Sequence, residues 1–460
     1  MSAYSSKTSF LRTYLYGETH LGFWSSVAKG IGLFNTFFII SSMTLYQYGV
    51  FQLLLATYGF LSDITSLGGG VVNNDIARAV GEKKEREARQ LFVEFYGLRF
   101  VVNLLLFCSV FFGAALFFPM YGEEFVGEVR VIAFMFLVDI LSVSVKTLLS
   151  IRLSFKTIAI RGTISKVAQF FILVYFFFFL HIGINEVIIS MIVGSLATSL
   201  LLLSPAVRGN RAWFGVGWAG KRFMLLELFS THGKWELVGQ LFARVSGRFQ
   251  PWLIKVFIST EAVAVFSVAQ TIINHIRDLL PVRTLPVLIP LDLSDRERIQ
   301  KIFSRGVKYL LFLSVALSLG ALVTIPIIIT LFFNQYTEAL PYFYLMLLSI
   351  PISAVGVFIS IFFVSFRKQK FLFIQEIFKN AVMIISFIFL LPLLGLWGMA
   401  LERIITSSAM VISSYYYMHK VKPGVRLFWR DIIRFDREDL EFFANLARRV
   451  GAKFGLLKSQ

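Results

Sequence analysis

The chain has 460 residues, of which 57% are hydrophobic and only 16% are charged. Together with a mean hydropathy of +0.74, this composition is typical of a polytopic helical membrane protein and argues against a soluble domain. A net charge of +18 would indicate nucleic acid binding in a soluble protein. Here most of the bases flank apolar runs, so topology explains them and no nucleic acid partner is expected. The single cysteine, Cys108, excludes intrachain disulfides and cysteine-cluster metal sites.

Runs of about 17–28 mostly apolar residues are long enough to cross a bilayer. The sequence contains twelve, at 21–45, 49–74, 91–118, 131–149, 164–180, 187–203, 235–258, 262–290, 309–333, 341–366, 371–391 and 395–418. They predict an all-α polytopic membrane protein with about twelve transmembrane helices. The expected order of its parts is a cytoplasmic segment 1–20, a six-helix bundle 21–203, an interfacial linker 204–234, a second six-helix bundle 235–418 and a basic amphipathic tail 419–460.

The loops between these runs alternate in charge. Loops on one side, such as 75–90, each carry at least two Lys or Arg, whereas those on the other side contain Arg130 as their only base and several glutamates. The positive-inside rule therefore predicts that both termini lie in the cytoplasm. The outer loops are also short, which counts against membrane glycosyltransferases and polysaccharide polymerases. The sequence lacks a His-Glu-x-x-His pair, a Walker glycine loop and a nucleophile elbow, so a transporter without covalent chemistry is expected.

Three cations lie in the apolar stretch from Lys234 to Ile258. On a continuous helix, Arg244, Arg248 and Lys255 would lie within roughly 40° of one another. A cationic stripe in a membrane span is costly and usually faces a water-filled cavity, so these residues predict a cationic lumen and an anionic cargo. Structural ion pairing is the alternative for the two arginines, and snorkelling to the interface is the alternative for Lys255. Lys29 and Arg277 are further candidates for substrate binding.

Carboxylates inside the predicted spans are candidates for coupling to H⁺ or Na⁺. Asp139 has no basic residue one turn away on its own helix, which leaves it the least explained acid. Asp63 and Glu376 are weaker candidates, and Glu376 lies one turn from Lys379, so a structural ion pair is its default interpretation. Apart from such an ion, no cofactor and no metal site are expected.

An internal repeat relates the two predicted halves. A shift of 215 residues without gaps places Lys29 on Arg244 and Asp63 on Asp278, with identities such as Gly32 with Gly247. Two six-span halves that start on the same side of the membrane imply a pseudo-twofold axis along the membrane normal.

Several segments, in order, resemble the polysaccharide transporter family of the multidrug/oligosaccharidyl-lipid/polysaccharide (MOP) exporter superfamily. Tyr48-Gly49-Val50-Phe51, followed by Asp63, Leu67-Gly68 and the basic loop from Arg78, is similar to the second-span signature of that family. In the second half the similar segments are Glu261 to Ala269, Pro286 to Pro290, Phe366 to Lys370 and Leu394 to Ala400. The sequence departs from the family at Gly247-Arg248, where many relatives have an Asp-Arg pair.

The resemblance implies a MATE-like, V-shaped arrangement of two six-helix bundles. It also implies a flippase that moves undecaprenyl-pyrophosphate-linked, or similar polyprenyl-linked, oligosaccharide across the bacterial inner or archaeal plasma membrane. The products of such transport include O-antigen, capsule and exopolysaccharide, so polysaccharide-assembly proteins are a candidate class of partner beside the lipid-linked substrate and membrane lipid. The rival hypotheses are a multidrug or small-molecule antiporter of the same superfamily, a membrane glycosyltransferase or polymerase, and a non-transporting membrane scaffold.

Overall fold

The computed structural model describes residues 7–152, 155–220, 223–230, 247–280, 296–366 and 368–421, together with Val425, Asp436 and Asp439. No described residue lies in a β-strand. The helices are α1 (Lys7–Ser42), α2 (Leu45–Thr65), α3 (Gly69–Gly81), α4 (Glu85–Gly113), η1 (Ala114–Phe117), α5 (Phe118–Ile151), α6 (Phe155–Phe179), α7 (Ile184–Gly209), η2 (Arg211–Gly215), α8 (Met224–Leu228), α10 (Gln250–Phe257), α11 (Thr260–Asp278), α13 (Arg296–Phe332), η5 (Asn334–Ala339), α14 (Leu340–Leu347), α15 (Ser349–Ser365), α16 (Gln369–Leu394) and α17 (Leu396–Val421).

The helices in the described residues include 6 that are long and apolar enough to cross a membrane, or up to 8 if each of two bent helix pairs is one span. These eight coincide with eight of the twelve predicted spans. The predicted spans 21–45 and 395–418 fall on α1 and α17, and parts of 235–258 and 262–290 fall on α10 and α11. The chain is therefore a multi-pass membrane protein, and the full count of twelve stays a prediction.

The chain divides into two compact units. The first comprises Met1–His275, Ile325–Phe343 and Met383–Ala400, and the second comprises Ile276–Thr324, Tyr344–Val382 and Leu401–Gln460. Several helices, among them α11 and α13, pass from one unit into the other. The predicted domain boundaries, including the linker at 204–234, stay predictions.

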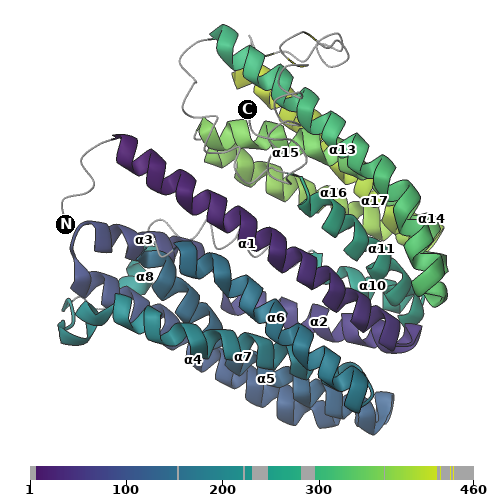
Figure 1. Cartoon of the computed structure of the whole chain (residues 1–460), viewed down its shortest axis with the longest axis horizontal. Helices are drawn as coiled ribbons and strands as arrows, with labels where there is room; N and C mark the ends of the chain where they lie inside the picture. Colours follow the sequence, from purple (N-terminus) through teal and green to yellow (C-terminus); the bar gives the residue numbers. More distant parts are fainter. Residues whose placement is uncertain are drawn as a thin grey trace, which may run out of the picture. The chain divides into compact units, whose positions relative to one another are not determined.

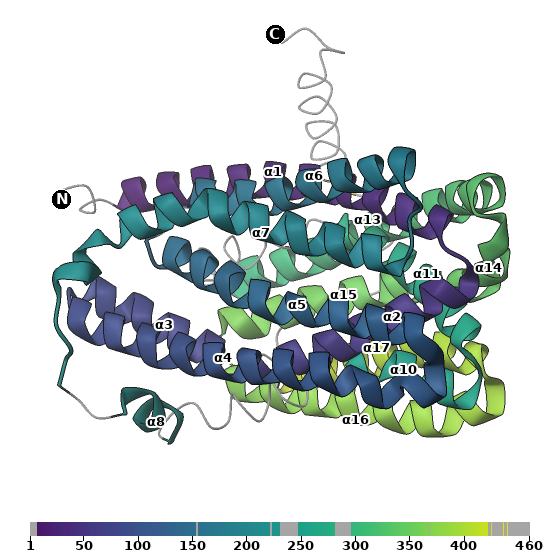
Figure 2. The same cartoon turned by 90° about the horizontal axis from the view of Figure 1, so that it is seen from below.

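Within the first unit the long helices pack along one another, with α1 beside α6, α5 beside α7, and α4 beside α5 (Figures 1 and 2). A polar contact fixes α1 against α6, because Asn35 on α1 donates to the backbone oxygen of Lys166 at 3.1 Å. Asn35 is only 2% exposed, so pairing its amide NH2 group inside the bundle avoids the cost of a buried unpaired donor.

Local sequence explains where α2 begins and ends. Thr44 and Gln47 form a capping box at its start, in which each side chain bonds the backbone N–H of the other residue. After Thr65 the chain bends by 43° into α3. Gly68 has a φ of 75° at this bend, a left-handed conformation that glycine adopts without a steric cost.

Near its start, α2 also makes a close backbone contact. Gly49 lies against Thr260, the first residue of α11, and a Cβ built on Gly49 would lie 2.9 Å from the Thr260 carbonyl carbon. Only glycine leaves room for this approach, so Gly49 brings the first turns of α2 and α11 together.

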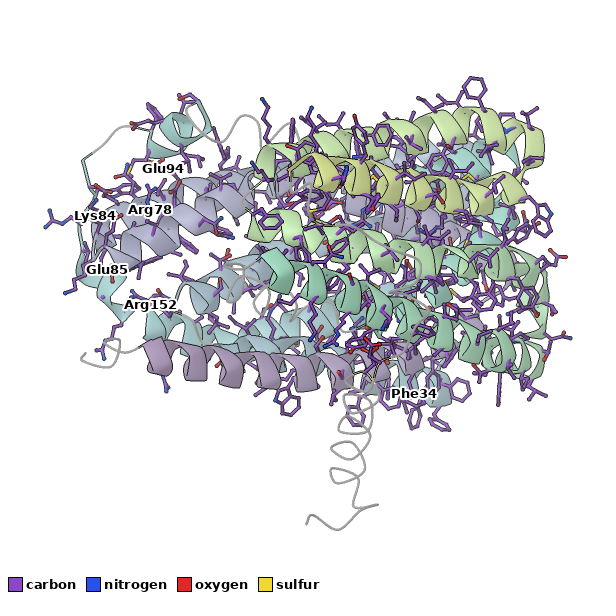
Figure 3. The ribbon with its side chains drawn as sticks, turned by 90° about the horizontal axis from the view of Figure 1, so that it is seen from above. Phe34, Arg78, Lys84, Glu85, Glu94 and Arg152 are labelled. Atoms are coloured by element: carbon purple, nitrogen blue, oxygen red, sulfur yellow. The ribbon has the colours of Figure 1, made fainter. Side chains whose placement is uncertain are left out.

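Beyond the end of α3, an ion pair joins the start of α4 to the residue that follows α5. Arg152 donates to both carboxylate oxygens of Glu85 at 3.1 Å, and the same carboxylate accepts from the Trp213 indole at 2.5 Å. Figure 3 shows Glu85 and Arg152 at this end of the first unit, with Arg78 and Lys84 nearby. Trp213 is buried in an apolar cluster with α3 and α4 residues, so part of the predicted interfacial linker packs against the first bundle.

The second unit has an aromatic core and a polar contact to the tail. Phe303 of α13 packs against Phe358 and Phe362 of α15. Asp439 is fully buried and accepts from Lys308 and Tyr309, both at 2.5 Å. The rest of the predicted amphipathic tail 419–460 lies outside the described residues, apart from 419–421 at the end of α17, Val425 and Asp436.

Candidate substrate-binding site

A polar pocket with a volume of about 260 Å³ lies between α2, the residues just before α10, α10 itself and α11. All of its lining residues belong to the first unit. They are Gln52, Leu55, Ala56, Gly247, Arg248, Gln250, Pro251, Ser267, Gln270, Thr271 and Asn274. Most of them are uncharged polar side chains, and the one ionisable group among them is the Arg248 guanidinium.

Arg248 is held in place by α2. Its Nε lies 2.9 Å from Oδ2 of Asp63, and the two side chains are 47% and 23% exposed. The guanidinium rests against the backbone of Gly59, where a Cβ would lie 2.7 Å from the guanidinium carbon. The glycine therefore lets the cation lie flat along α2, and the pocket leaves part of its N–H donors accessible to a ligand.

The carboxamide groups come from three helices. Gln52 lies on α2, Gln250 on α10, and Gln270 and Asn274 on α11. Gln270 donates to Gln250 at 3.4 Å, which joins two of these groups across the pocket. A carboxamide both donates and accepts hydrogen bonds, so this lining can bind hydroxyl groups of a neutral polar molecule. The guanidinium can bind a phosphate oxygen pair through two parallel hydrogen bonds.

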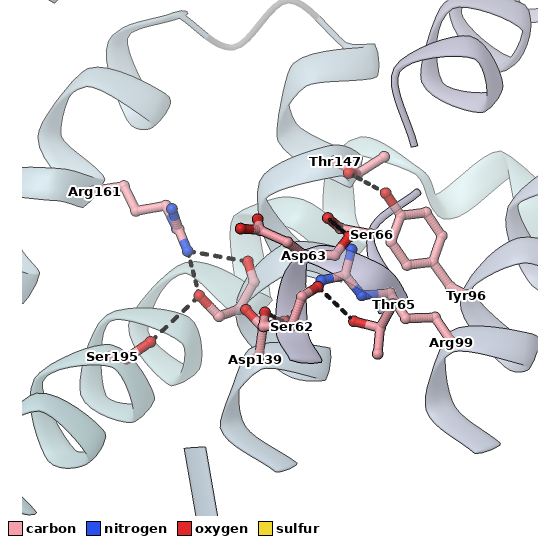
Figure 4. A network of polar contacts seen from close by, with 11 residues as sticks. Ser62, Asp63, Thr65, Ser66, Tyr96, Arg99, Asp139, Thr147, Arg161 and Ser195 are labelled. Carbon is pink, nitrogen blue, oxygen red and sulfur yellow. Dashed lines mark hydrogen bonds and ion pairs between the residues drawn. The ribbon is translucent and has the colours of Figure 1, made fainter. Parts of the chain in front are cut away.

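A second polar network lies in the core of the first unit beside the end of α2 (Figure 4). Arg99 of α4 and Asp139 of α5 form an ion pair at 2.7 Å, and their side chains are 5% and 18% exposed. Ser62 on α2 donates to the same Asp139 carboxylate at 3.4 Å. Arg161 on α6 donates to the Ser142 backbone oxygen of α5 at 3.1 Å. Figure 4 places Asp63 close to this network.

The predicted cationic stripe from Arg244 to Lys255 is not continuous. The helix breaks at Phe249, and α10 starts at Gln250 with Pro251 in its first turn. Proline lacks an N–H and disfavours helical geometry in the residue before it, so a helix that contains it in mid-course bends or breaks there. As a result Arg248 lines the polar pocket, whereas Lys255 lines a different one.

That second pocket, the apolar pocket, has a volume of about 420 Å³. Lys255 lies 5.3 Å from the centroid of the Trp252 ring at this pocket. The lining residues are Tyr46, Val50, Leu53, Leu54, Thr57, Tyr58, Leu61, Leu106, Ser109, Val110, Gly113, Leu116, Phe125, Val129, Ile132, Phe136, Trp252, Lys255 and Thr260.

A family model described as polysaccharide biosynthesis protein matches residues 19–291, more than half of the chain and all of both pockets. The chain belongs to this family. The resemblance stated from the sequence is therefore confirmed. No curated protein sequence gives a significant match to this chain.

Solved structures of MOP superfamily transporters share its fold. The lipid II flippase MurJ in an inward closed conformation matches with a TM-score of 0.72 at 13% identity, over 93% of this chain and 92% of that one. An inward-facing multidrug resistance MATE family transporter matches with a TM-score of 0.70 at 15% identity, over 87% and 94%. A MOP superfamily transporter from Pyrococcus furiosus Vc1, described by the reversed polarity of its binding pocket, matches with 0.64 at 15%, over 90% and 96%. These matches confirm the predicted MATE-like all-α fold of this family member.

The other predicted substrate-binding residues are not among the described lining of the polar pocket. Arg244 lies outside the described residues. Lys29 lies half-buried on α1. Arg277 follows the pocket residue Asn274 on α11, but it belongs to the second unit, where it interacts electrostatically with Arg403 of α17. Their roles in binding stay predictions.

The three candidate acids all have basic partners. Asp139 pairs with Arg99 of a neighbouring helix, and Asp63 pairs with Arg248. Glu376 forms an ion pair with Lys379 one turn further along α16, which agrees with its default interpretation from the sequence. Among the described residues, no group of three or more His, Cys, Asp or Glu is placed to hold a metal ion.

The carboxamide lining was not predicted from the sequence. A signal for it was present, because the α11 members of the pocket recur every three to four residues in an otherwise apolar segment and so share one helix face. They are Ser267, Gln270, Thr271 and Asn274. That these residues face Gln52 on α2 depends on how α2 and α11 pack, and no pattern in the sequence indicates it.

Proposed function

We propose that this protein is a flippase for a polyprenyl-linked oligosaccharide, such as an undecaprenyl-pyrophosphate-linked precursor of O-antigen or another surface polysaccharide. It would act in the cytoplasmic membrane, with both termini in the cytoplasm. Membership of the polysaccharide biosynthesis family supports this proposal. So does the fold shared with the lipid II flippase MurJ.

The observation that carries the proposal is the chemistry of the polar pocket. One guanidinium, from Arg248, stands among four carboxamides and two hydroxyl-bearing side chains, and none of the described residues that line the pocket is an acid. A sugar pyrophosphate presents the complementary groups, namely negatively charged oxygens beside many neutral hydroxyls. A hydrogen bond to a charged group is worth about 1.5–3 kcal/mol net, so Arg248 alone would contribute substantially to headgroup affinity.

Transport would require no bond to be made or broken. The headgroup would bind in the polar pocket while the lipid chain stays in an apolar environment, and the two bundles would alternate access around the bound headgroup. Asp63 would compete with the pyrophosphate for Arg248 and so limit how long the headgroup is held. Arg244, Lys29 and Arg277 remain proposed contributors to a cationic path.

Coupling to an H⁺ or Na⁺ gradient is part of the proposal. Asp63 is a proposed coupling acid because it pairs with the guanidinium that would bind the pyrophosphate. Glu376 is a further proposed coupling acid, and coupling through Asp139 is the alternative to a structural role for its ion pair with Arg99. Polysaccharide-assembly proteins remain a proposed class of partner.

The test is flipping of a fluorescent polyprenyl-pyrophosphate-linked sugar in proteoliposomes, normalised to folded protein. We expect the fraction of labelled lipid that an impermeant quencher can reach to change over time in proteoliposomes with the wild type. In empty liposomes this fraction should stay constant. Equal rates in both would overturn the proposal.

The alternative function is a multidrug or small-molecule antiporter, which the MATE-fold neighbours support. Many drug cargoes are cations and would be repelled by Arg248. Uptake of a cationic dye that is competed by drugs, but not by the lipid-linked sugar, would favour the antiporter.

A further inference from the structure

The apolar pocket shares helices α2, α10 and α11 with the polar pocket but opens on another side of α2. At 100° per residue, the α2 residues of the polar pocket and those of the apolar pocket centre about 180° apart around the helix. The first set is Gln52, Leu55 and Ala56, with Gly59 and Asp63 on the same face. The second is Val50, Leu53, Leu54, Thr57, Tyr58 and Leu61. Helix α2 is thus a wall with a polar recess on one face and an apolar recess on the other.

The apolar pocket has the size and lining of a ligand site. Its volume of about 420 Å³ lies within the range of ~300–1,000 Å³ that is usual for small-molecule sites. Its floor is well packed, since Leu53, Val129, Ile132 and Phe136 are each less than 8% exposed. Its edge is open, since Tyr46 is 50% and Leu116 is 80% exposed. A long apolar chain could therefore enter from the lipid side and lie along α4 and α5.

One charge stands at this pocket. Among the described residues that line it, Lys255 is the single charged one, and its ammonium lies over the Trp252 ring. Trp252 is itself fixed to α2, because its indole donates to Thr57 at 3.1 Å. An ammonium beside an apolar recess is complementary to an amphiphile whose phosphate is attached directly to a hydrocarbon chain.

We infer that the apolar pocket binds the first isoprenoid units of the polyprenyl carrier, with the carrier's phosphate on Lys255. This inference rests on the proposed function and extends it, because it assigns a chain site distinct from the headgroup pocket. Headgroup and chain are then bound on opposite faces of α2 at different steps. The polar pocket holds the sugar pyrophosphate in passage, and the apolar pocket holds the carrier once its phosphate has reached the Lys255 end.

Gly113 offers a way to fill the pocket without disturbing its walls. It lines the pocket at the end of α4, and a Cβ built on it meets no atom within 4 Å. Gly113→Phe should therefore place a ring in the space of the chain. Gly97 lies on the same helix, is exposed, and also has no atom within 4 Å of a built Cβ. Gly97→Phe is the matched control for the change in helix propensity and apolar surface.

The experiment uses a polyprenyl phosphate that carries a photoreactive diazirine in its first isoprene units, with purified full-length protein in liposomes. We expect cross-links on α2, α4 or α5 peptides that unlabelled polyprenyl phosphate competes and excess phosphatidylglycerol does not. Gly113→Phe should reduce them roughly tenfold, Lys255→Gln should weaken them less, and Gly97→Phe should leave them unchanged. Gly113→Leu, with a smaller side chain, provides the comparison if the Phe variant folds poorly.

Three outcomes would overturn the inference. The first is cross-linking to peptides outside α2, α4 and α5. The second is equal competition by phosphatidylglycerol, which would identify a phospholipid chain as the occupant. The third is full cross-linking and flipping by a folded Gly113→Phe variant. Failure of the proposed function has a different signature, because then the wild type itself does not flip the lipid-linked sugar.

Discussion

Two ion pairs in the first unit involve the same kinds of groups but differ in their surroundings. Arg99 and Asp139 lie 2.7 Å apart with side chains 5% and 18% exposed, whereas Arg248 and Asp63 lie 2.9 Å apart with side chains 47% and 23% exposed. Removing one member of a desolvated pair leaves an uncompensated buried charge. An accessible pair is weak and can exchange one partner for a ligand. The comparison therefore assigns the first pair to stability and the second to binding.

The largest effect is expected at the buried pair. Arg99→Met should lower the free energy of unfolding by about 3–5 kcal/mol, because Asp139 is left charged without its partner. Thermal unfolding in detergent and the yield of folded protein measure this. The double change Arg99→Met with Asp139→Leu should recover much of the loss. If Asp139→Asn instead keeps full stability and loses only gradient-driven transport, Asp139 is a coupling acid and the assignment to stability is wrong.

The next largest effect is expected at Arg248. Arg248→Ala should weaken headgroup binding roughly ten- to hundredfold, because a charge-assisted bidentate contact is lost. Its unfolding midpoint should stay close to that of the wild type, since the side chain is half exposed. Arg248→Lys keeps the charge without the planar fork and should restore binding only in part.

Binding of a water-soluble sugar pyrophosphate, measured by calorimetry, tests this directly. Arg208→Ala, at an exposed position at the end of α7, is the control for loss of one positive charge. Normal affinity in folded Arg248→Ala would remove the polar pocket from the transport path.

A smaller effect in the opposite direction is expected at Asp63. Asp63→Asn removes the competitor for the Arg248 guanidinium, so headgroup affinity should rise. The rise should be roughly two- to fivefold, because an exposed ion pair contributes little free energy. Flipping should nevertheless slow, because release becomes harder. Equilibrium binding and single-turnover flipping measure the two consequences separately. Reduced affinity would mean that Asp63 positions Arg248 and does not compete for it.

The smallest variation with pH is expected at a third ion pair, between the buried Asp439 and Lys308. Burial alone would raise the pKa of Asp439, but hydrogen bonds from Lys308, Tyr309 and the backbone of Asp436 outweigh it and lower the pKa to about 2. A carboxyl with a depressed folded pKa stabilises above its ordinary pKa of about 3.9 and loses that contribution as the pH falls towards 2. The difference in unfolding midpoint between wild type and Asp439→Asn should thus stay constant from pH 5 to 8. A difference that varied across that range would contradict the lowered pKa.

Much of the architecture could be predicted from the sequence because it depends on local composition. Apolar runs are read directly along the chain, and the intramembrane position of Arg248 follows from its place in such a run. The bend between α2 and α3 inside the predicted span 49–74 was not predicted. The Arg99–Asp139 pair could not be predicted in this way, since its members are forty residues apart on different helices. Pro251 was a visible sign of a break in the stripe, but its effect on the directions of Arg248 and Lys255 depends on packing against α2. The carboxamide pocket likewise exists only once α2, α10 and α11 meet.

The close approach of Gly49 to Thr260 has a mechanical consequence. A contact between backbones has no side chain that can rotate out of the way, so it acts as a fulcrum for any rotation of α2 relative to α11. Measured from Gly49 at 1.5 Å per residue, Gln52 has a lever arm of about 4.5 Å and Asp63 one of about 21 Å. The same small rotation therefore displaces Asp63 about five times as far as Gln52. The Asp63–Arg248 ion pair is placed where the leverage is greatest, and the carboxamide end of the pocket where it is least.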